Sequence, residues 1–126
     1  MEYITSFRLK SLDERQTKYM NLRKKYPDRF AFVIDRADSK GPEIDSHLFL
    51  VPSSTVLSTL QIILRSRVKL NQTNSLFLFV TTFNNEEKTN SIVLSQPSKS
   101  ISQIWKQYAS NDGFVYIVYA LENAFG

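Results

Sequence analysis

The segment from residue 56 to residue 68 restricts the fold of this chain more than any other part of the sequence. Its apolar residues recur every three or four positions, which predicts an amphipathic helix with one face buried against another layer. Strand-like segments flank it, residues 48–51 before it and residues 76–80 after it. A helix that crosses over between strands of one sheet predicts an α+β domain. We expect the hydroxyls of Ser53 and Ser54 to cap its first turn.

Other local patterns supply the rest of the fold. Ser11 and Glu14 are spaced as a capping box, which begins a second helix that Pro27 ends. Polar residues dominate the stretch 81–90, so we expect a loop there and a further loop over 91–99. The remaining expected elements are a short helix over residues 3–9, a strand over 30–34, a turn over 38–42, a short helix over 101–108 and a final strand over 114–121.

This order of helices and strands predicts a four-stranded mixed sheet with the β-grasp arrangement of ubiquitin-like proteins, preceded by a helical extension. A chain of 126 residues is long enough for one domain and too short for two ordinary ones. We therefore expect a single ubiquitin-like domain over residues 1–126. It comprises an N-terminal helical extension over 1–27, a core over 28–121 and a flexible tail over 122–126.

The residue types in the chain exclude several classes of site. There is no cysteine, which excludes disulfides, zinc–thiolate centres and thiol nucleophiles. The single histidine, His47, lies in a predicted loop near Glu43 and Asp45, without a nucleophile pattern or a glycine-rich phosphate loop. We expect His47 to be a solvated loop residue, and the protein to be no enzyme and to use neither a metal nor a cofactor.

Positive charge is concentrated at the start of the chain. The net charge is +4, and residues 1–29 carry eight basic and four acidic side chains, whereas residues 30–126 carry eight of each. Such a segment is suited to attract nucleic acid, anionic lipid or acidic peptides. A nucleic-acid-binding module is the weakest of these interpretations, because the aromatic residues follow core patterns and do not interleave with the basic ones.

The sequence contains no obvious targeting or membrane-spanning segment. The apolar run over residues 114–121 is far shorter than the roughly 20 residues that a spanning helix needs. The first residues, Met1 to Tyr3, lack the basic start and the apolar stretch of a signal peptide. We expect a cytoplasmic or nuclear protein, whose membrane attachment, if it has one, comes from outside the fold.

Three blocks of residues match one known family, in order and at similar spacing, over nearly the whole chain. The first block is Tyr26-Pro-Asp-Arg29 with Asp35-Arg-Ala-Asp38. The second consists of Pro42-Glu-Ile-Asp45, Phe49-Leu-Val-Pro52 and Arg65-Ser-Arg67. The third consists of Asp112-Gly-Phe-Val-Tyr116, Tyr119, Glu122-Asn123 and Phe125-Gly126. Through them the chain resembles the autophagy ubiquitin-like modifiers, which include the GABA-receptor-associated proteins and the microtubule-associated light chains, as a divergent member in the mature, glycine-ended form.

The resemblance implies a modifier whose target is a lipid. In this family, activating and conjugating enzymes join the carboxylate of the terminal glycine, here Gly126, to phosphatidylethanolamine. Phe125 resembles the aromatic residue that the processing protease and these enzymes recognise. A protein-conjugating modifier usually ends in two glycines, so it fits less well. The implied protein is a cytoplasmic monomer that becomes anchored on autophagosomal membranes; an interaction module without lipid conjugation stays an alternative.

The resemblance also implies a docking face for cargo receptors. Family members bind motifs of the form aromatic-x-x-aliphatic, which add a strand to an exposed sheet edge and fill two pockets. Carried over by position, the edge strand is residues 48–51. The aromatic pocket is expected to be lined by Lys18, Leu22, Ala31, Val33, Leu48, Leu50 and Phe114. The aliphatic pocket is expected to be lined by Phe49, Val51, Pro52, Leu60, Ile63 and Arg67.

Three of these residues depart from the family's pattern. Lys18 replaces an acidic residue, Ala31 replaces a proline, and Leu48 replaces the lysine that commonly covers the aromatic pocket. The cover of this pocket is therefore expected to be more apolar than in other family members. The helical residue beside it is expected to carry a positive charge where the family has a negative one. Because opposite charges attract, we expect a preference for motifs with acidic residues near the aromatic side chain.

Overall fold

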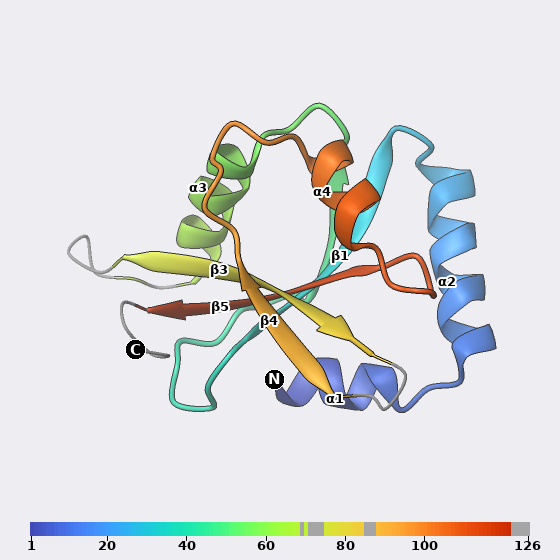
Figure 1. The fold of residues 1–126 in the computed structure, drawn as a ribbon, viewed down its shortest axis with the longest axis horizontal. Helices are drawn as coiled ribbons and strands as arrows, with labels where there is room; N and C mark the ends of the chain where they lie inside the picture. Colours follow the sequence, from blue (N-terminus) through green and yellow to red (C-terminus); the bar gives the residue numbers. More distant parts are fainter. Residues whose placement is uncertain (69, 71–74, 85–87, 122–126) are drawn as a thin grey trace.

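A computed structural model describes residues 1–68, 70, 75–84 and 88–121, which form a mixed sheet between two helical layers (Figure 1). The helices are α1 (Glu2–Arg8), α2 (Leu12–Lys25), α3 (Leu57–Arg67) and α4 (Ile101–Tyr108). The strands are β1 (Arg29–Arg36), β2 (Leu48–Pro52), β3 (Leu76–Phe83), β4 (Thr89–Val93) and β5 (Val115–Leu121). The predicted α+β class is therefore confirmed.

The sheet has the strand order β2-β1-β5-β3-β4. The central pair, β1 and β5, is parallel, and every other neighbouring pair is antiparallel. The two edges of the sheet are thus β2 on one side and β4 on the other. Both are short strands of five residues, whereas the strands between them run for seven or eight.

The prediction of four strands is wrong, because the described part of the sheet holds five. The missed strand, β4, lies in the stretch that the sequence indicated as polar loop, and β3 continues to Phe83 instead of ending at Val80. All five residues of β4 are exposed, so it has no apolar alternation that a sequence pattern could reveal. Backbone pairing with β3, from Phe79 with Val93 to Phe83 with Thr89, forms this strand.

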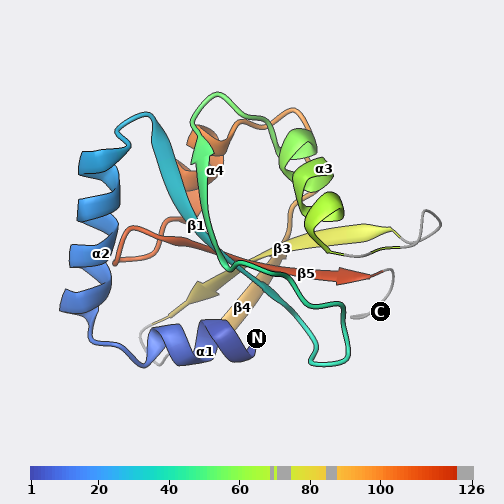
Figure 2. The ribbon, with the colours of Figure 1, turned by 180° about the vertical axis from the view of Figure 1, so that it is seen from behind.

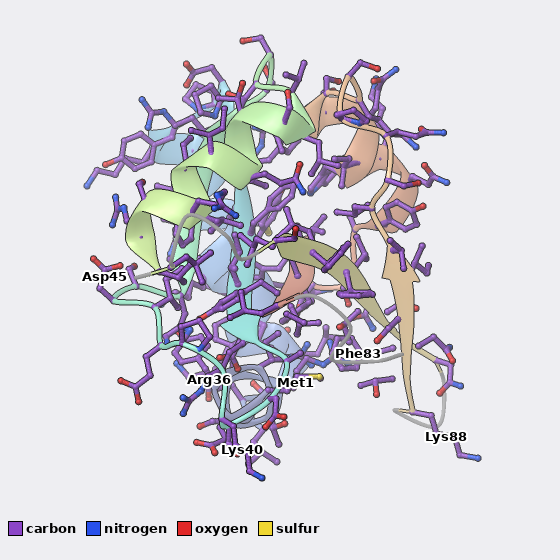
Figure 3. The ribbon with its side chains drawn as sticks, turned by 90° about the vertical axis from the view of Figure 1, so that its left-hand side faces the viewer. Met1, Arg36, Lys40, Asp45, Phe83 and Lys88 are labelled. Carbon is purple, nitrogen blue, oxygen red and sulfur yellow. The ribbon has the colours of Figure 1, made fainter. Side chains whose placement is uncertain are left out.

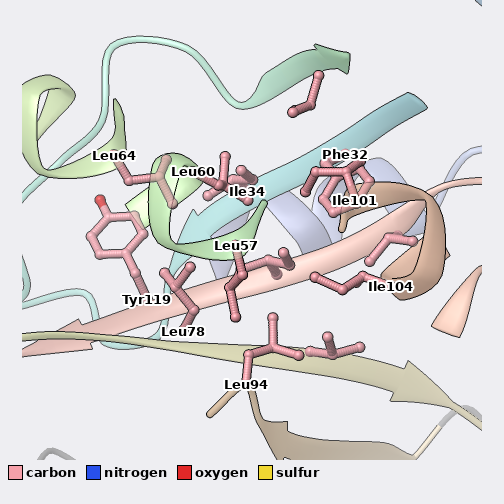
Figure 4. Packing of buried hydrophobic residues seen from close by; sticks show 14 of the residues in the cluster. Phe32, Ile34, Leu57, Leu60, Leu64, Leu78, Leu94, Ile101, Ile104 and Tyr119 are labelled. Carbon is pink, nitrogen blue, oxygen red and sulfur yellow. The ribbon is translucent and has the colours of Figure 1, made fainter. Parts of the chain in front are cut away.

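The two faces of the sheet carry separate apolar clusters. The first lies under α3 and α4, where Leu60, Leu64 and Ile104 pack on Ile34 and Leu78 (Figure 4). The second lies under α1 and α2; its buried members are Ile4, Phe7, Tyr19, Ala31, Val33, Phe79, Phe114, Tyr116, Val118 and Ala120. Because successive side chains of a strand point to opposite faces, the almost fully buried strand β5 contributes to both clusters.

The helix starts follow the sequence only in part. Ser11 caps α2 as predicted, since its hydroxyl accepts a hydrogen bond from the amide of Glu14. The expected capping of α3 by Ser53 and Ser54 is wrong. Its N-cap is Val56, whose side chain makes no capping bond and whose extended backbone forms an isolated bridge with Ser100. This tertiary pairing keeps the chain extended for longer than the local sequence indicates.

The first residues of the chain are held against the end of β1. The Met1 ammonium donates a hydrogen bond to the carbonyl of Arg36 at 2.7 Å, and the two residues lie together in Figure 3. The carboxylate of Asp35 accepts from the amides of Tyr3 and Ile4, and so caps α1. His47 lies in the predicted loop but is only partly solvated, because its ring stacks on the Tyr3 ring with centroids 4.1 Å apart and its side chain is 27 % exposed.

Candidate functional site

The edge strand β2 connects both predicted pockets. It pairs with β1 through the register Val33 with Leu48 to Arg29 with Pro52, and its other edge has no strand partner among the described residues. Figure 2 shows this strand beside β1, between α2 and α3. Leu48 and Leu50 pack in the cluster under α1 and α2, whereas Phe49 and Val51 pack in the cluster under α3 and α4. The open edge is therefore flanked by apolar side chains on both faces.

The six residues predicted for the aliphatic pocket all line one hollow of about 230 Å³ between β2 and α3. Val51 and Leu60 form its buried floor, while Ile63 is 37 % exposed at its wall. Three further residues line this hollow: Ser46, which was not predicted, and Leu48 and Leu50, which were predicted for the aromatic pocket. At the rim, Arg67 Nη1 lies 3.5 Å from Asp45 Oδ2, and both side chains are exposed. Such an exposed pair contributes little to stability, so the Arg67 side chain can be reoriented at little cost.

The residues predicted for the aromatic pocket form a packed group instead of an open cavity. Ala31, Val33 and Phe114 are each no more than 1 % exposed. Leu22, Leu48 and Leu50 are half-buried against the cluster that contains those three residues. An incoming aromatic side chain would contact these leucines first. Lys18 is exposed on α2, one helical turn before Leu22, so the two side chains lie on the same face of the helix.

The position of α2 depends on a buried ion pair that the sequence analysis missed. Arg15 Nη1 donates to Asp112 Oδ2 at 2.7 Å, and the two residues are only 6 % and 2 % exposed. Burial opposes the charge of Arg15, but hydrogen bonds and attraction from Tyr116 and Asp112 outweigh it and raise the Arg15 pKa. The sequence does carry a signal: Arg15 precedes Tyr19 by one turn on the apolar stripe of the helix.

Two buried tyrosines on β5 predict a loss of stability at alkaline pH. Burial, reinforced by the nearby charge of Asp35, raises the pKa of Tyr119 from 10 to about 12, and burial raises that of Tyr116 as well. The unfolded chain therefore loses these protons first. The stabilisation is complete below pH 10 and is lost as the pH rises through about 12.

This pH dependence can be measured by urea unfolding between pH 8 and pH 12. The Tyr119 hydroxyl donates to the carbonyl of Pro42, so Tyr119→Phe costs some stability at neutral pH but is expected to flatten the alkaline decline. Tyr108→Phe, at a half-buried tyrosine on α4, serves as the control and is expected to keep the wild-type profile. An unchanged decline in Tyr119→Phe would contradict the prediction.

Other predicted features concern the tail, metals and membranes. Phe125 and Gly126 lie outside the described residues, which end at Leu121 of β5. Within the described ranges, no group of three or more histidine, aspartate or glutamate side chains could hold a metal ion. None of the helices in this part of the chain is both long and apolar enough to cross a membrane.

Comparisons with known proteins agree on one family. A family model described as autophagy protein Atg8, ubiquitin-like, matches residues 14–126. Autophagy-related protein 8d of Arabidopsis thaliana is 32 % identical over 116 residues, which cover 91 % of this chain and 88 % of that protein. Autophagy-related protein 8 of Schizosaccharomyces pombe is 31 % identical over 117 residues, which cover 92 % and 88 %.

The fold leads to the same family. The crystal structure of Trypanosoma brucei ATG8 matches this structure with a TM-score of 0.76 and 30 % identity, over 94 % of each chain. The family resemblance drawn from the sequence and the ubiquitin-like fold are both confirmed. The chain belongs to the Atg8 family of ubiquitin-like autophagy proteins.

Proposed function

We propose that this protein is a lipid-conjugated autophagy modifier that recruits cargo receptors and adaptors through the open edge of β2. The proposed docking rests on the way apolar side chains alternate along that strand. Leu48 and Leu50 pack on one face of the sheet, and Phe49 and Val51 pack on the other. A peptide strand added at this edge alternates in the same way. Residues three positions apart in that peptide therefore point to opposite faces.

This alternation matches a motif of the form aromatic-x-x-aliphatic. Its aliphatic residue would enter the hollow of about 230 Å³ beside α3, and its aromatic residue would lie against Leu22 on the side of α2. Backbone hydrogen bonds to β2 supply affinity, and the two apolar contacts supply specificity. Lys18 is exposed beside the aromatic position, which supports the preference for acidic residues there.

The lipid half of the proposal rests on the family and on the last residues of the sequence. The family model matches through residue 126, and the sequence ends in Phe125-Gly126. Phosphatidylethanolamine carries two acyl chains, which give stable membrane anchoring where one chain gives only marginal binding. We propose residues 122–126 as the conjugation tail, Gly126 as the linked residue, and Phe125 as the residue that the processing protease and the conjugation enzymes recognise.

The remaining properties follow from the same proposal. Residues 1–27 form the helical extension and 28–121 the core of one domain. The protein is a monomer without enzymatic activity of its own, and it moves between the cytoplasm and autophagosomal membranes. Its partners are the activating and conjugating enzymes, the processing protease, receptors with the motif, and membranes that contain phosphatidylethanolamine. An interaction module that never receives lipid is the alternative.

Reconstituted lipidation tests the proposal. The chain is incubated with the family's activating and conjugating enzymes, ATP and phosphatidylethanolamine liposomes. The expected result is a product with the added mass of the lipid that floats with the liposomes. Gly126→Ala is the matched variant and is expected to give no product. If the wild-type chain gains no lipid mass while an established family member does in the same mixture, lipid conjugation is rejected and the interaction module remains.

Peptide binding tests the docking site separately. Ile63→Arg places a charge at the wall of the aliphatic hollow. It is expected to weaken the binding of an aromatic-x-x-aliphatic peptide, so that the Kd measured by fluorescence anisotropy rises by at least about tenfold. Ile62→Arg is the control, because Ile62 is the neighbouring residue of α3, is 67 % exposed and does not line the hollow. Equal affinities of the two variants would place the peptide elsewhere.

A further inference from the structure

A second and larger hollow lies far from the docking edge. Its volume is about 540 Å³, and it opens where the end of β3 meets the α1–α2 connection and the residues that follow α4. In the sheet, β1 and β5 separate β3 from β2, so this hollow is distinct from the docking site. Small-molecule sites in proteins typically measure roughly 300–1,000 Å³. The hollow therefore has room for an organic molecule as well as for an ion.

Two arginines give this hollow an excess of positive charge. Arg8 and Arg15 both line it, and no acidic side chain does so among the described residues. The nearest carboxylate, Asp112, lies 2.7 Å from Arg15 Nη1 and 3.7 Å from Arg8 Nη1. Asp112 already accepts hydrogen bonds from Arg15, from the Tyr116 hydroxyl and from the amide of Phe114. One carboxylate thus serves two guanidinium groups, which leaves one positive charge in excess.

Arg8 is the arginine that remains available to a ligand. Its guanidinium stacks on the Phe83 ring, with the central carbon 3.9 Å from the ring centroid. Its other contacts are loose: Nη1 donates to Ser110 Oγ over a long 3.4 Å and lies 3.7 Å from Asp112 Oδ2, and the guanidinium also interacts with the Tyr116 hydroxyl. Stacking fixes the orientation of the guanidinium plane, while the N–H groups at its edge can still donate hydrogen bonds. This arrangement suits a carboxylate or a phosphate group as the acceptor.

Thr81 supplies a second and independent indication of a ligand. It lines the hollow and is 98 % buried, and its Oγ1 has no hydrogen-bond partner among the described residues. In the alternation of β3 it lies between Phe79 and Phe83, which both pack in the cluster under α1 and α2, so its side chain faces the layer that contains Arg8. An unpaired buried hydroxyl costs about 1–3 kcal/mol. Because Oγ1 has less than 1 Å² of accessible surface, a ligand oxygen reaches it only when the Thr81 side chain rotates toward the hollow, and that contact would remove the cost.

We infer that this hollow binds a small organic molecule that carries a carboxylate or a phosphate group. The anionic group is held by the Arg8 guanidinium and the Thr81 hydroxyl, and the organic remainder lies against Leu12 and Tyr108, which also line the hollow. Leu12 belongs to the apolar stripe of α2 but is 39 % exposed. A ligand in the hollow would therefore cover part of its apolar surface.

Calorimetric titration of the full chain with glycerol 3-phosphate, succinate and inorganic phosphate tests this inference. Binding of an organic anion more tightly than inorganic phosphate is expected, and the tighter organic probe identifies the phosphate or the carboxylate class. Arg8→Gln is expected to weaken that binding at least tenfold. Thr81→Val, which keeps the shape of the side chain, is expected to weaken it about threefold or more without lowering the melting temperature. Lys24→Gln removes an exposed charge from α2 outside the hollow and is expected to have no effect.

Three results would overturn the inference. The first is no binding of any probe, and the second is inorganic phosphate binding as tightly as either organic probe. The third is equal weakening by Arg8→Gln and Lys24→Gln, which would indicate only diffuse attraction. Amide NMR shifts at residues 81–84 and 108–111 give the location independently of affinity.

Discussion

Asp112→Ala is expected to lower the free energy of unfolding by roughly 3–5 kcal/mol, which is the usual cost of removing one partner from a buried ion pair. Asp112 is 2 % exposed and is the acceptor for Arg15 Nη1, for the Tyr116 hydroxyl and for the amide of Phe114. Without this carboxylate, the 6 % exposed Arg15 keeps its charge and loses its buried partner. Urea unfolding followed by circular dichroism measures the change.

A double-mutant cycle separates the ion pair from the other contacts of Asp112. Arg15→Met removes the buried positive charge that Asp112→Ala leaves unpaired. The double variant is therefore expected to regain part of the stability that Asp112→Ala loses. Asp28→Ala, at an exposed acidic residue, is expected to change the free energy of unfolding by less than about 0.5 kcal/mol. If Asp112→Ala and Asp28→Ala cost the same, the ion pair does not hold α2 in place.

Gly113→Ala is expected to lower the free energy of unfolding by roughly 2–5 kcal/mol, for two reasons that add. Gly113 has a φ of +98°, which residues with a Cβ atom adopt only with strain. A Cβ atom would also lie 2.3 Å from Cδ1 and 2.6 Å from Cγ of Tyr19. That ring makes an edge contact with Phe114 and stacks near Trp105, so it cannot move without disturbing the core.

The steric part of this effect can be isolated by shrinking the neighbour. Tyr19→Val destabilises the protein through a cavity, but in that background Gly113→Ala is expected to cost markedly less than in the wild type. Gly41→Ala serves as the comparison and is expected to cost less, because Gly41 has no positive φ and its added Cβ would make a tight contact of 3.2 Å with the Asp38 carbonyl oxygen instead of overlapping a buried ring. Strictly additive losses for Tyr19→Val and Gly113→Ala would contradict the proposed clash.

The buried aromatic stack connects these two residues to the proposed docking surface. Trp105 Nε1 donates to the carbonyl of Gly113 at 2.7 Å, and the Trp105 ring stacks with Phe30 of β1. Phe114, which follows Gly113, is a member of the group predicted to line the aromatic pocket. A change at Asp112 or Gly113 is therefore expected to alter peptide binding through the position of Phe114, without any contact with the peptide.

Local sequence patterns predicted most of the helices and strands correctly. The spacing of apolar residues identified α3, and Ser11 identified the start of α2, because amphipathic spacing and capping act within one or two turns of chain. The family resemblance predicted which residues lie together beside α3, since all six residues predicted for the aliphatic pocket line one hollow. The strand β4 was missed because its residues are exposed and its existence depends on pairing with β3.

The α+β class and the family could be inferred from the amino-acid sequence alone, because both depend on the types of side chain and their spacing along the chain. The three-dimensional packing was needed to show that Arg15, which looks like one more surface cation in the sequence, is a buried partner of Asp112, 97 residues away. It also shows that the buried Thr81 hydroxyl has no hydrogen-bond partner in the described part of the chain, and that Thr81 lines the same hollow as Arg8. Contacts of this kind join distant segments, so their energies arise only after the sheet and its helices have packed together.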